Sequence, residues 1–98
     1  PLGPLAEPGP GGRAARLLAK ASGGAVTLLS FAEGGGLPAH TAATDALVFV
    51  LEGRLTLEID GVPVEAGTGS VVRIPATAPH AVRAPVAARM LLVTLRDA

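Results

Sequence analysis

Two histidines, His40 and His80, are the only imidazole side chains in this 98-residue chain. Imidazole is the commonest metal ligand in proteins and the natural acid–base group near neutral pH. His40 ends the segment Leu37-Pro38-Ala39-His40, and His80 follows Pro75-Ala76-Thr77-Ala78-Pro79, so each comes directly after a proline-containing turn. If two opposite sheets bring these strand edges together, the pair forms a candidate site for a metal or a small molecule.

A metal site normally needs more than two imidazoles. Catalytic zinc sites use three protein ligands, and the non-haem iron triad adds one carboxylate to two histidines. Asp45 is the candidate third ligand, and its alternative interpretation is a solvated loop residue, because Asp is rarely buried without a partner. The residues leave the cofactor open, and a divalent transition metal such as Fe, Mn, Ni, Zn or Cu is the candidate. Without a metal, His40 and His80 are expected to hydrogen-bond each other, threonines or water.

The composition excludes several other chemistries. The chain has no cysteine, so disulfides, thiol nucleophiles, zinc–thiolate sites and iron–sulfur clusters are ruled out. No serine has the Gly-x-Ser-x-Gly setting of a hydrolase nucleophile.

The 8 basic residues balance the 8 acidic ones, and phosphate binding needs an uncompensated basic surface, so nucleic acid is not an expected partner. No apolar run approaches the ~20 residues that span a bilayer, so no membrane partner is expected and the protein is predicted to be cytoplasmic.

Short strands must position the histidines, because 13 glycines and 9 prolines are too many for a helical bundle. The segment 46–51 (ALVFVL) is apolar throughout, which predicts a strand buried on both faces. Residues 14–20 are ambiguous between a strand and a helical turn, and residues 1–13 are predicted to form an irregular N-terminal arm. Apolar runs between turn residues predict further strands at 25–31, 70–74, 80–84 and 88–95.

The clearest local signal is a hairpin around Asp60-Gly61. Residues 54–59 alternate strictly between polar and apolar side chains, and the segment 62–65 follows the Asp-Gly pair at once. Asp-Gly suits a type I′ turn because both of its central positions need positive φ. Together these patterns predict about eight strands, with turns every ~8–12 residues, in a single antiparallel sandwich or barrel over residues 14–98.

At this level of detail the chain resembles a small single-domain cupin of the RmlC-like jelly-roll class. Five residues separate Gly34 from His40, as in the family's first motif, and the second motif's spacing recurs from Gly69 through Pro75 to His80. The resemblance implies an all-β fold, an antiparallel double-stranded β-helix or jelly-roll barrel. It covers residues 16–95 and rests on the stretches LPAH, VFVLEGRLTLEIDG and VVRIPATAPHAV.

The side chains that hold a metal in a typical cupin are only partly present. Counting along the motifs, the second histidine falls at Ala42, the glutamate at Ala46 and the asparagine at Ala84. Only the positions of His40 and His80 keep the family's residues. Asp45 lies beside the glutamate position, and strand alternation points it to the opposite face unless the register shifts by one residue.

Two functions therefore stay open, and the residues do not decide whether the chain is an enzyme. The first is binding of a small molecule, with or without a metal, in a barrel mouth lined by His40, His80 and Phe49. The alternative is a metal-dependent cupin enzyme of the oxygenase or isomerase type, in which His40 and His80 form a reduced ligand set and Asp45 or water completes it. A sensory or interaction module would need a separate protein. The resemblance to small cupins implies a homodimer, which the thin core of so short a chain and its sheet edges also favour.

Overall fold

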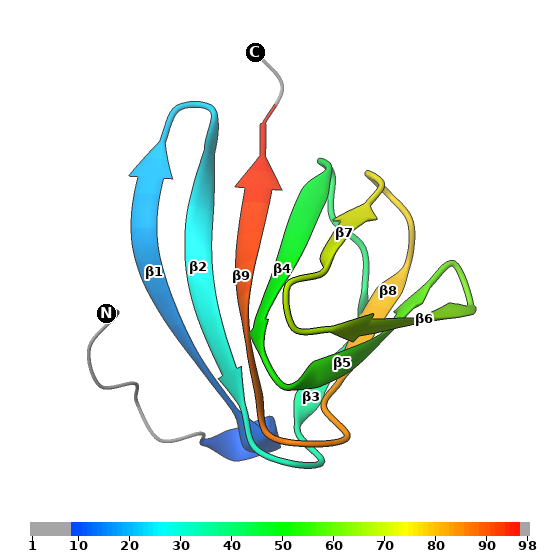
Figure 1. Ribbon diagram of the computed structural model, residues 1–98. Helices are drawn as coiled ribbons and strands as arrows, with labels where there is room; N and C mark the ends of the chain where they lie inside the picture. Colours follow the sequence, from blue (N-terminus) through cyan, green and yellow to red (C-terminus); the bar gives the residue numbers. More distant parts are fainter. Residues whose placement is uncertain (1–8, 97–98) are drawn as a thin grey trace.

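The structure is a computed structural model that describes residues 9–96. Strands account for most of this part of the chain, and they form two antiparallel sheets that face each other (Figure 1). The elements in chain order are η1 (Pro10–Gly12), β1 (Arg13–Ala21), β2 (Gly24–Phe31), β3 (Gly36–His40), β4 (Ala46–Glu52), β5 (Arg54–Ile59), β6 (Val62–Gly67), β7 (Val71–Ile74), β8 (His80–Arg83) and β9 (Ala88–Leu95).

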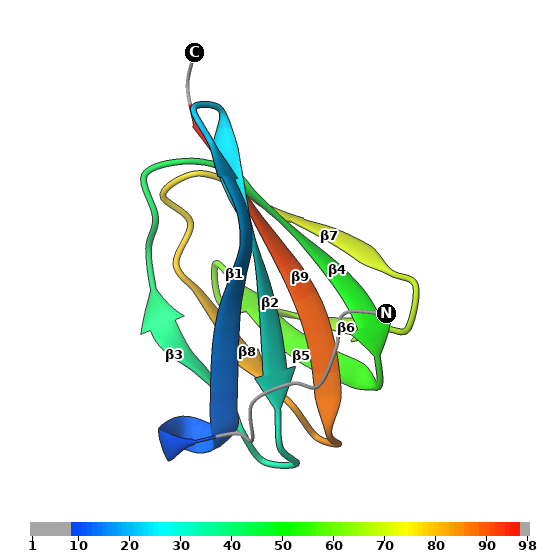
Figure 2. The same ribbon diagram turned by 90° about the vertical axis from the view of Figure 1, so that its left-hand side faces the viewer.

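The chain crosses repeatedly between the two sheets. One sheet has the order β1-β2-β9-β4-β7 and the other the order β3-β8-β5-β6, so strands distant in sequence, such as β2 and β9, lie side by side. This is the predicted jelly roll, and the all-β antiparallel prediction is confirmed. The ambiguous segment 14–20 proves to be strand: it lies in β1, which pairs with β2 at the edge of the five-stranded sheet (Figure 2).

The core lies between the sheets and is aliphatic. Leu55 and Leu57 from the four-stranded sheet face Val48 and Met90 from the five-stranded sheet, and all four side chains are buried. Each of these strands places alternate residues in the core, as pleated strands must. This packing fixes which side chains point to the interior and which to the outer face.

The prediction that residues 46–51 are buried on both faces is wrong. Ala46, Val48 and Val50 are buried in the core, whereas Leu47, Phe49 and Leu51 are only half-buried. The reason is that these three side chains point to the outer face of the five-stranded sheet, where no other strand of the described residues packs against them. The continuous apolar run therefore forms a strand that is apolar on both faces. One face packs in the core, and the other lies on the outer surface of the sheet.

The hairpin around Asp60-Gly61 forms as predicted. Asp60 has φ 53° and Gly61 has φ 78°, the positive values that a type I′ turn needs at both positions. The flanking residues Ile59 and Val62 are partners in the β5–β6 ladder. The turn chemistry therefore sets the register of two of the four strands in the sheet that carries the histidines.

The N-terminal arm expected over residues 1–13 lies mostly outside the described residues. Within the described part, Pro10–Gly12 form one 3-10 turn and Arg13 is already the first residue of β1. The Arg13 guanidinium donates a hydrogen bond from Nη1 to the carbonyl of Gly36 at 2.9 Å, which ties the start of β1 to β3 of the other sheet. No helix among residues 9–96 is long and apolar enough to cross a bilayer.

Candidate functional site

The two histidines meet within the four-stranded sheet. His40 is the last residue of β3, His80 is the first residue of β8, and these strands pair antiparallel with His40 and His80 as direct partners. The expectation that they come together from opposite sheets is therefore wrong in its topology. The antiparallel β3–β8 ladder places the end of one strand beside the start of the other, so a single sheet brings the rings together.

The imidazole rings lie in direct contact. Their centroids are 4.2 Å apart and their planes meet at 63°, an edge-to-face arrangement. Nδ1 of His40 lies 3.0 Å from the carbonyl oxygen of Pro38, and Nδ1 of His80 lies 3.0 Å from that of Ala78. A carbonyl oxygen only accepts, so each Nδ1 must carry the proton. In the neutral form, each Nε2 then has a free lone pair.

The pair is accessible from one side. His80 is 8% exposed, whereas His40 is exposed to solvent. Beside His80, on the side away from His40, lies its ladder partner Ile59, a half-buried side chain that packs against the core cluster. The site is thus a polar pair that solvent reaches at His40 and that borders the aliphatic side chain of Ile59 at His80.

Asp45 is held elsewhere. Its Oδ1 accepts a hydrogen bond of 2.7 Å from the backbone N–H of Ala76, and its Oδ2 pairs with the guanidinium of Arg73 at 3.0 Å. The backbone hydrogen bond, followed by the bond to Arg73, holds the pKa of Asp45 below its ordinary value. To ligate a metal beside the histidines, this carboxylate would have to leave both partners. No group of three or more metal-ligand side chains forms in the described part of the chain.

Phe49 does not share a face with the histidine pair. In β4 the core positions are Ala46, Val48 and Val50, so Phe49 points to the outer face of the five-stranded sheet, beside its ladder partners Val71 and Leu91. The sequence pattern alone could not assign a face, because the run is apolar at every position. We therefore leave Phe49 out of the candidate site.

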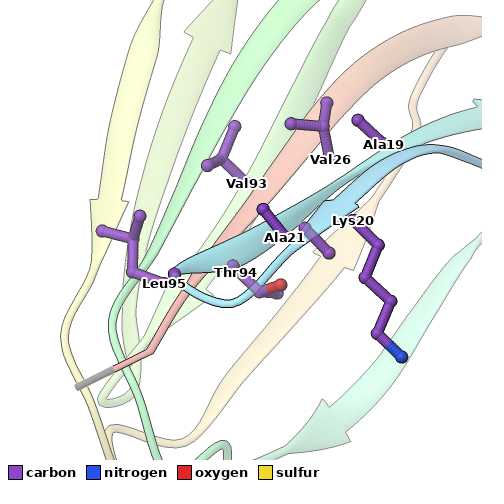
Figure 3. A pocket seen from close by; sticks show the side chains of 10 residues that line it. Ala19, Lys20, Ala21, Val26, Val93, Thr94 and Leu95 are labelled. Atoms are coloured by element: carbon purple, nitrogen blue, oxygen red, sulfur yellow. The ribbon is translucent and has the colours of Figure 1, made fainter. Parts of the chain in front are cut away.

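An apolar hollow of about 270 Å³ lies at the β1–β2 hairpin, where it also borders the end of β9 (Figure 3). Ala19, Val26 and Val93 are ladder neighbours there, on the same outer face as Phe49. Neither histidine lines this hollow. The hollow and the histidine pair are thus separate features of the surface.

The site also contains a contact that the sequence analysis missed. The backbone N–H of Thr77 donates to the carbonyl of Ala42 at 2.8 Å, so the segment after His40 is bonded to the segment before His80. Thr77 has φ 67°, in the left-handed region. The sequence held one signal for this contact: Thr77 occupies the position of the internal glycine in the second motif of the family that the chain resembles.

The comparison with protein families decides the identity of the fold. Residues 27–94 match the family model of the cupin domain. The chain belongs to the cupin family. No curated protein shows significant similarity to this cupin domain over its sequence.

Solved structures agree with this assignment. A conserved protein of unknown function from Streptococcus pyogenes is 28% identical, with a TM-score of 0.83, over 92% of this chain and 79% of its own. A cupin 2 conserved barrel domain protein from Leptotrichia buccalis is 32% identical, also with a TM-score of 0.83, over 90% of this chain and 43% of its own. Salicylate 1,2-dioxygenase from Pseudaminobacter salicylatoxidans has a TM-score of 0.80 at 13% identity, over 85% of this chain and 26% of its own, a likeness of fold alone.

The alanines at the family's functional positions differ in their surroundings. Ala46, at the glutamate position, is 6% exposed and Ala84, at the asparagine position, is fully buried, so both are core residues in this cupin. Ala42, at the second histidine position, is exposed in the loop between β3 and β4. At two of these three positions a buried methyl group therefore stands where the family has a polar side chain.

Proposed function

We propose that this cupin domain binds a small molecule at the barrel mouth, through the His40–His80 pair. The observation that carries the proposal is the hydrogen-bond pattern that the two touching rings share. Each Nδ1 donates to the carbonyl two residues upstream, at 3.0 Å, which leaves two Nε2 acceptors on touching rings. Such a site suits a small molecule that bears hydrogen-bond donors, such as a hydroxyl or an amine.

Burial and polarity support this use of the pair. His80 is nearly buried, and its Nδ1 is hydrogen-bonded to the carbonyl oxygen of Ala78. These two constraints hold the His80 ring in one rotamer. Exposed His40 offers the route from solvent. Fixed polar groups beside an aliphatic side chain such as Ile59 are usual components of a small-molecule site.

The alternative, a metal-dependent enzyme of the oxygenase or isomerase type, has partial support. A histidine that ligates a metal usually donates its other ring N–H to a carbonyl or carboxylate, and both rings here make that bond. The ligand set does not fit, however, because Asp45 is bound to Ala76 and Arg73 and the described residues offer no third ligand beside the pair. Elemental analysis after reloading with Fe, Mn, Ni, Zn and Cu tests this alternative, and stoichiometric retention of one of them would favour it.

The binding proposal is tested by NMR on the purified chain, with a panel of small polyols and amino alcohols as probes. Binding probes are expected to shift the imidazole nitrogen signals of both histidines. His80→Phe keeps a flat ring and removes the acceptor, so affinity should fall about two- to tenfold, the equivalent of one net hydrogen bond. A probe that binds the double variant H40F/H80F as tightly as the unaltered chain, or a panel without any binding, would contradict the proposal.

A further inference from the structure

We propose that Asp45 is a positioning residue for His80, acting through the loop that precedes it. The inference deepens the proposed function, since it explains how the His40–His80 pair is held in one geometry. Asp45 touches neither ring in this arrangement. Its carboxylate instead fixes the backbone of the loop between β7 and β8. In that loop, the carbonyl oxygen of Ala78 orients the His80 ring.

The first step is the anchor itself. Asp45 lies immediately before β4, and Ala76 lies two residues after the end of β7. The 2.7 Å bond between Oδ1 of Asp45 and the N–H of Ala76 joins these two positions, which are 31 residues apart in sequence. Arg73 holds the other carboxylate oxygen at 3.0 Å, so the carboxylate is oriented from both sides. A hydrogen bond to an ionised acceptor is stronger than a neutral one.

The second step leads from the anchor to the ring. The loop Pro75–Pro79 is short, with a proline at each end, and the N–H of Ala78 donates back to the carbonyl of Pro75 at 3.2 Å. This turn places the carbonyl of Ala78 where it accepts from Nδ1 of His80. Displacement of Ala76 would move that turn and with it the acceptor that sets the tautomer of His80.

The third step connects both histidines. Asp45 and Ala42 belong to the same short segment, which runs from His40 at the end of β3 to Ala46 at the start of β4. That segment holds the loop before His80 at two points, through the carbonyl of Ala42 and the carboxylate of Asp45. The contact between the two rings therefore depends on two hydrogen bonds that join the segments flanking them.

The test compares variants at Asp45 by imidazole nitrogen NMR on the whole chain. Asp45→Ala removes the anchor, and we expect the single Nδ1–H tautomer signature of His80 to become a mixture and the ring-to-ring nuclear Overhauser effect to His40 to be lost. Asp45→Asn keeps an oxygen acceptor for the Ala76 N–H and should restore both signals. A purely structural contribution to stability would not separate these two variants in the tautomer signature.

Glu52→Gln is the matched control. Glu52 also pairs with an arginine, Arg89, at 3.4 Å, but no backbone bond to the histidine loops accompanies that pair, so the His80 signals should not change. If Asp45→Ala does not fold, Asp45→Glu replaces it: the longer side chain keeps the charge for Arg73 and misplaces the acceptor for Ala76. A folded Asp45→Ala or Asp45→Glu variant with unchanged His80 tautomer and ring contact overturns the inference.

This outcome is independent of ligand binding. If the polyol and amino alcohol probes fail to bind while Asp45→Ala still disturbs the His80 tautomer, the proposed function fails and the positioning role stands. If the probes bind through His80 and Asp45→Ala leaves the ring as it was, the positioning role fails alone.

Discussion

Thr77 donates its backbone N–H to the carbonyl of Ala42 at 2.8 Å while its own φ is 67°. A β-branched residue at positive φ is a genuine conformational outlier, because its Cβ crowds the backbone. The bond joins the two segments that carry the histidines. The strained residue is therefore kept at the point where the site is assembled, a place where backbone strain commonly concentrates in proteins.

Thr77→Gly should stabilise the fold. Glycine removes the cost of roughly 1–2 kcal/mol that a side chain has in the left-handed backbone conformation. It also lowers the free energy of unfolding by roughly 0.5–1 kcal/mol, because the unfolded chain gains conformational freedom. The net gain is about 0.5–1 kcal/mol, which corresponds to a rise in Tm of roughly 2–8 °C for a domain of this size. Thermal unfolding measures it. Thr77→Ala keeps a Cβ and should change Tm little, so an equal gain in both variants would contradict the strain argument.

Gly53→Ala should destabilise the protein strongly. Gly53 links β4 to β5 where the chain passes between the sheets, at φ 74°, and an added Cβ would collide with the carbonyl oxygen of Ala87. The control is Gly69→Ala, since Gly69 has φ 86° with no atom within 4 Å of the added Cβ. The control should cost about 1–2 kcal/mol from its backbone conformation alone. Chemical denaturation should show a clearly larger decrease in the free energy of unfolding for Gly53→Ala than for Gly69→Ala. Equal decreases would count against a collision between the added Cβ and Ala87.

The Asp45–Ala76 bond should make stability depend on acid pH. The pKa of Asp45 is lowered in the folded state, first by the Ala76 N–H and then by Arg73, so folding favours the ionised form. Its contribution is complete above the ordinary carboxyl pKa of 3.8 and is lost as pH falls through the lower folded value. The free-energy difference between the unaltered chain and Asp45→Asn should therefore shrink below about pH 4. A difference that stays constant from pH 6 to pH 3 would contradict this linkage.

The outer face of the five-stranded sheet should pair two copies of the chain. Val26, Leu47, Phe49 and Val93 lie half-buried on this face, and their exposure leaves an apolar surface that a second copy would cover. We expect size-exclusion chromatography with light scattering to show a dimer. Val93→Lys should shift it to monomer, because a charge would be buried at the interface.

The matched control for this pairing is Ala81→Lys. Ala81 lies on the outer face of the four-stranded sheet, with Glu58 as its cross-strand partner and Arg83 two residues further along β8, and a lysine there should leave the dimer intact. A concentration-independent monomer for the unaltered chain would contradict the prediction. Equal dissociation by both lysines would place the interface elsewhere.

Local patterns in the sequence determined most of the fold. Alternation over residues 54–59 and the Asp60-Gly61 pair predict one hairpin with its turn type, because turn conformation and strand pleat depend on neighbouring residues. The motif spacing also singled out His40 and His80, the two residues whose rings the structure brings into contact. The prediction was less successful for residues 46–51, since an all-apolar run does not reveal which face meets the core.

Tertiary structure alone decided how the site is built. The meeting of His40 with His80 depends on the register of β3 against β8, and the anchoring of Ala76 by Asp45 spans 31 residues. Such contacts arise when strands and loops that are distant in the sequence come together, so no property of either segment by itself encodes them. The sequence identified the two histidines as the candidate pair. The pairing of β3 with β8 brings their rings into contact, and the carbonyls of Pro38 and Ala78 select their tautomers. The hydrogen bond to Ala76 keeps Asp45 apart from them.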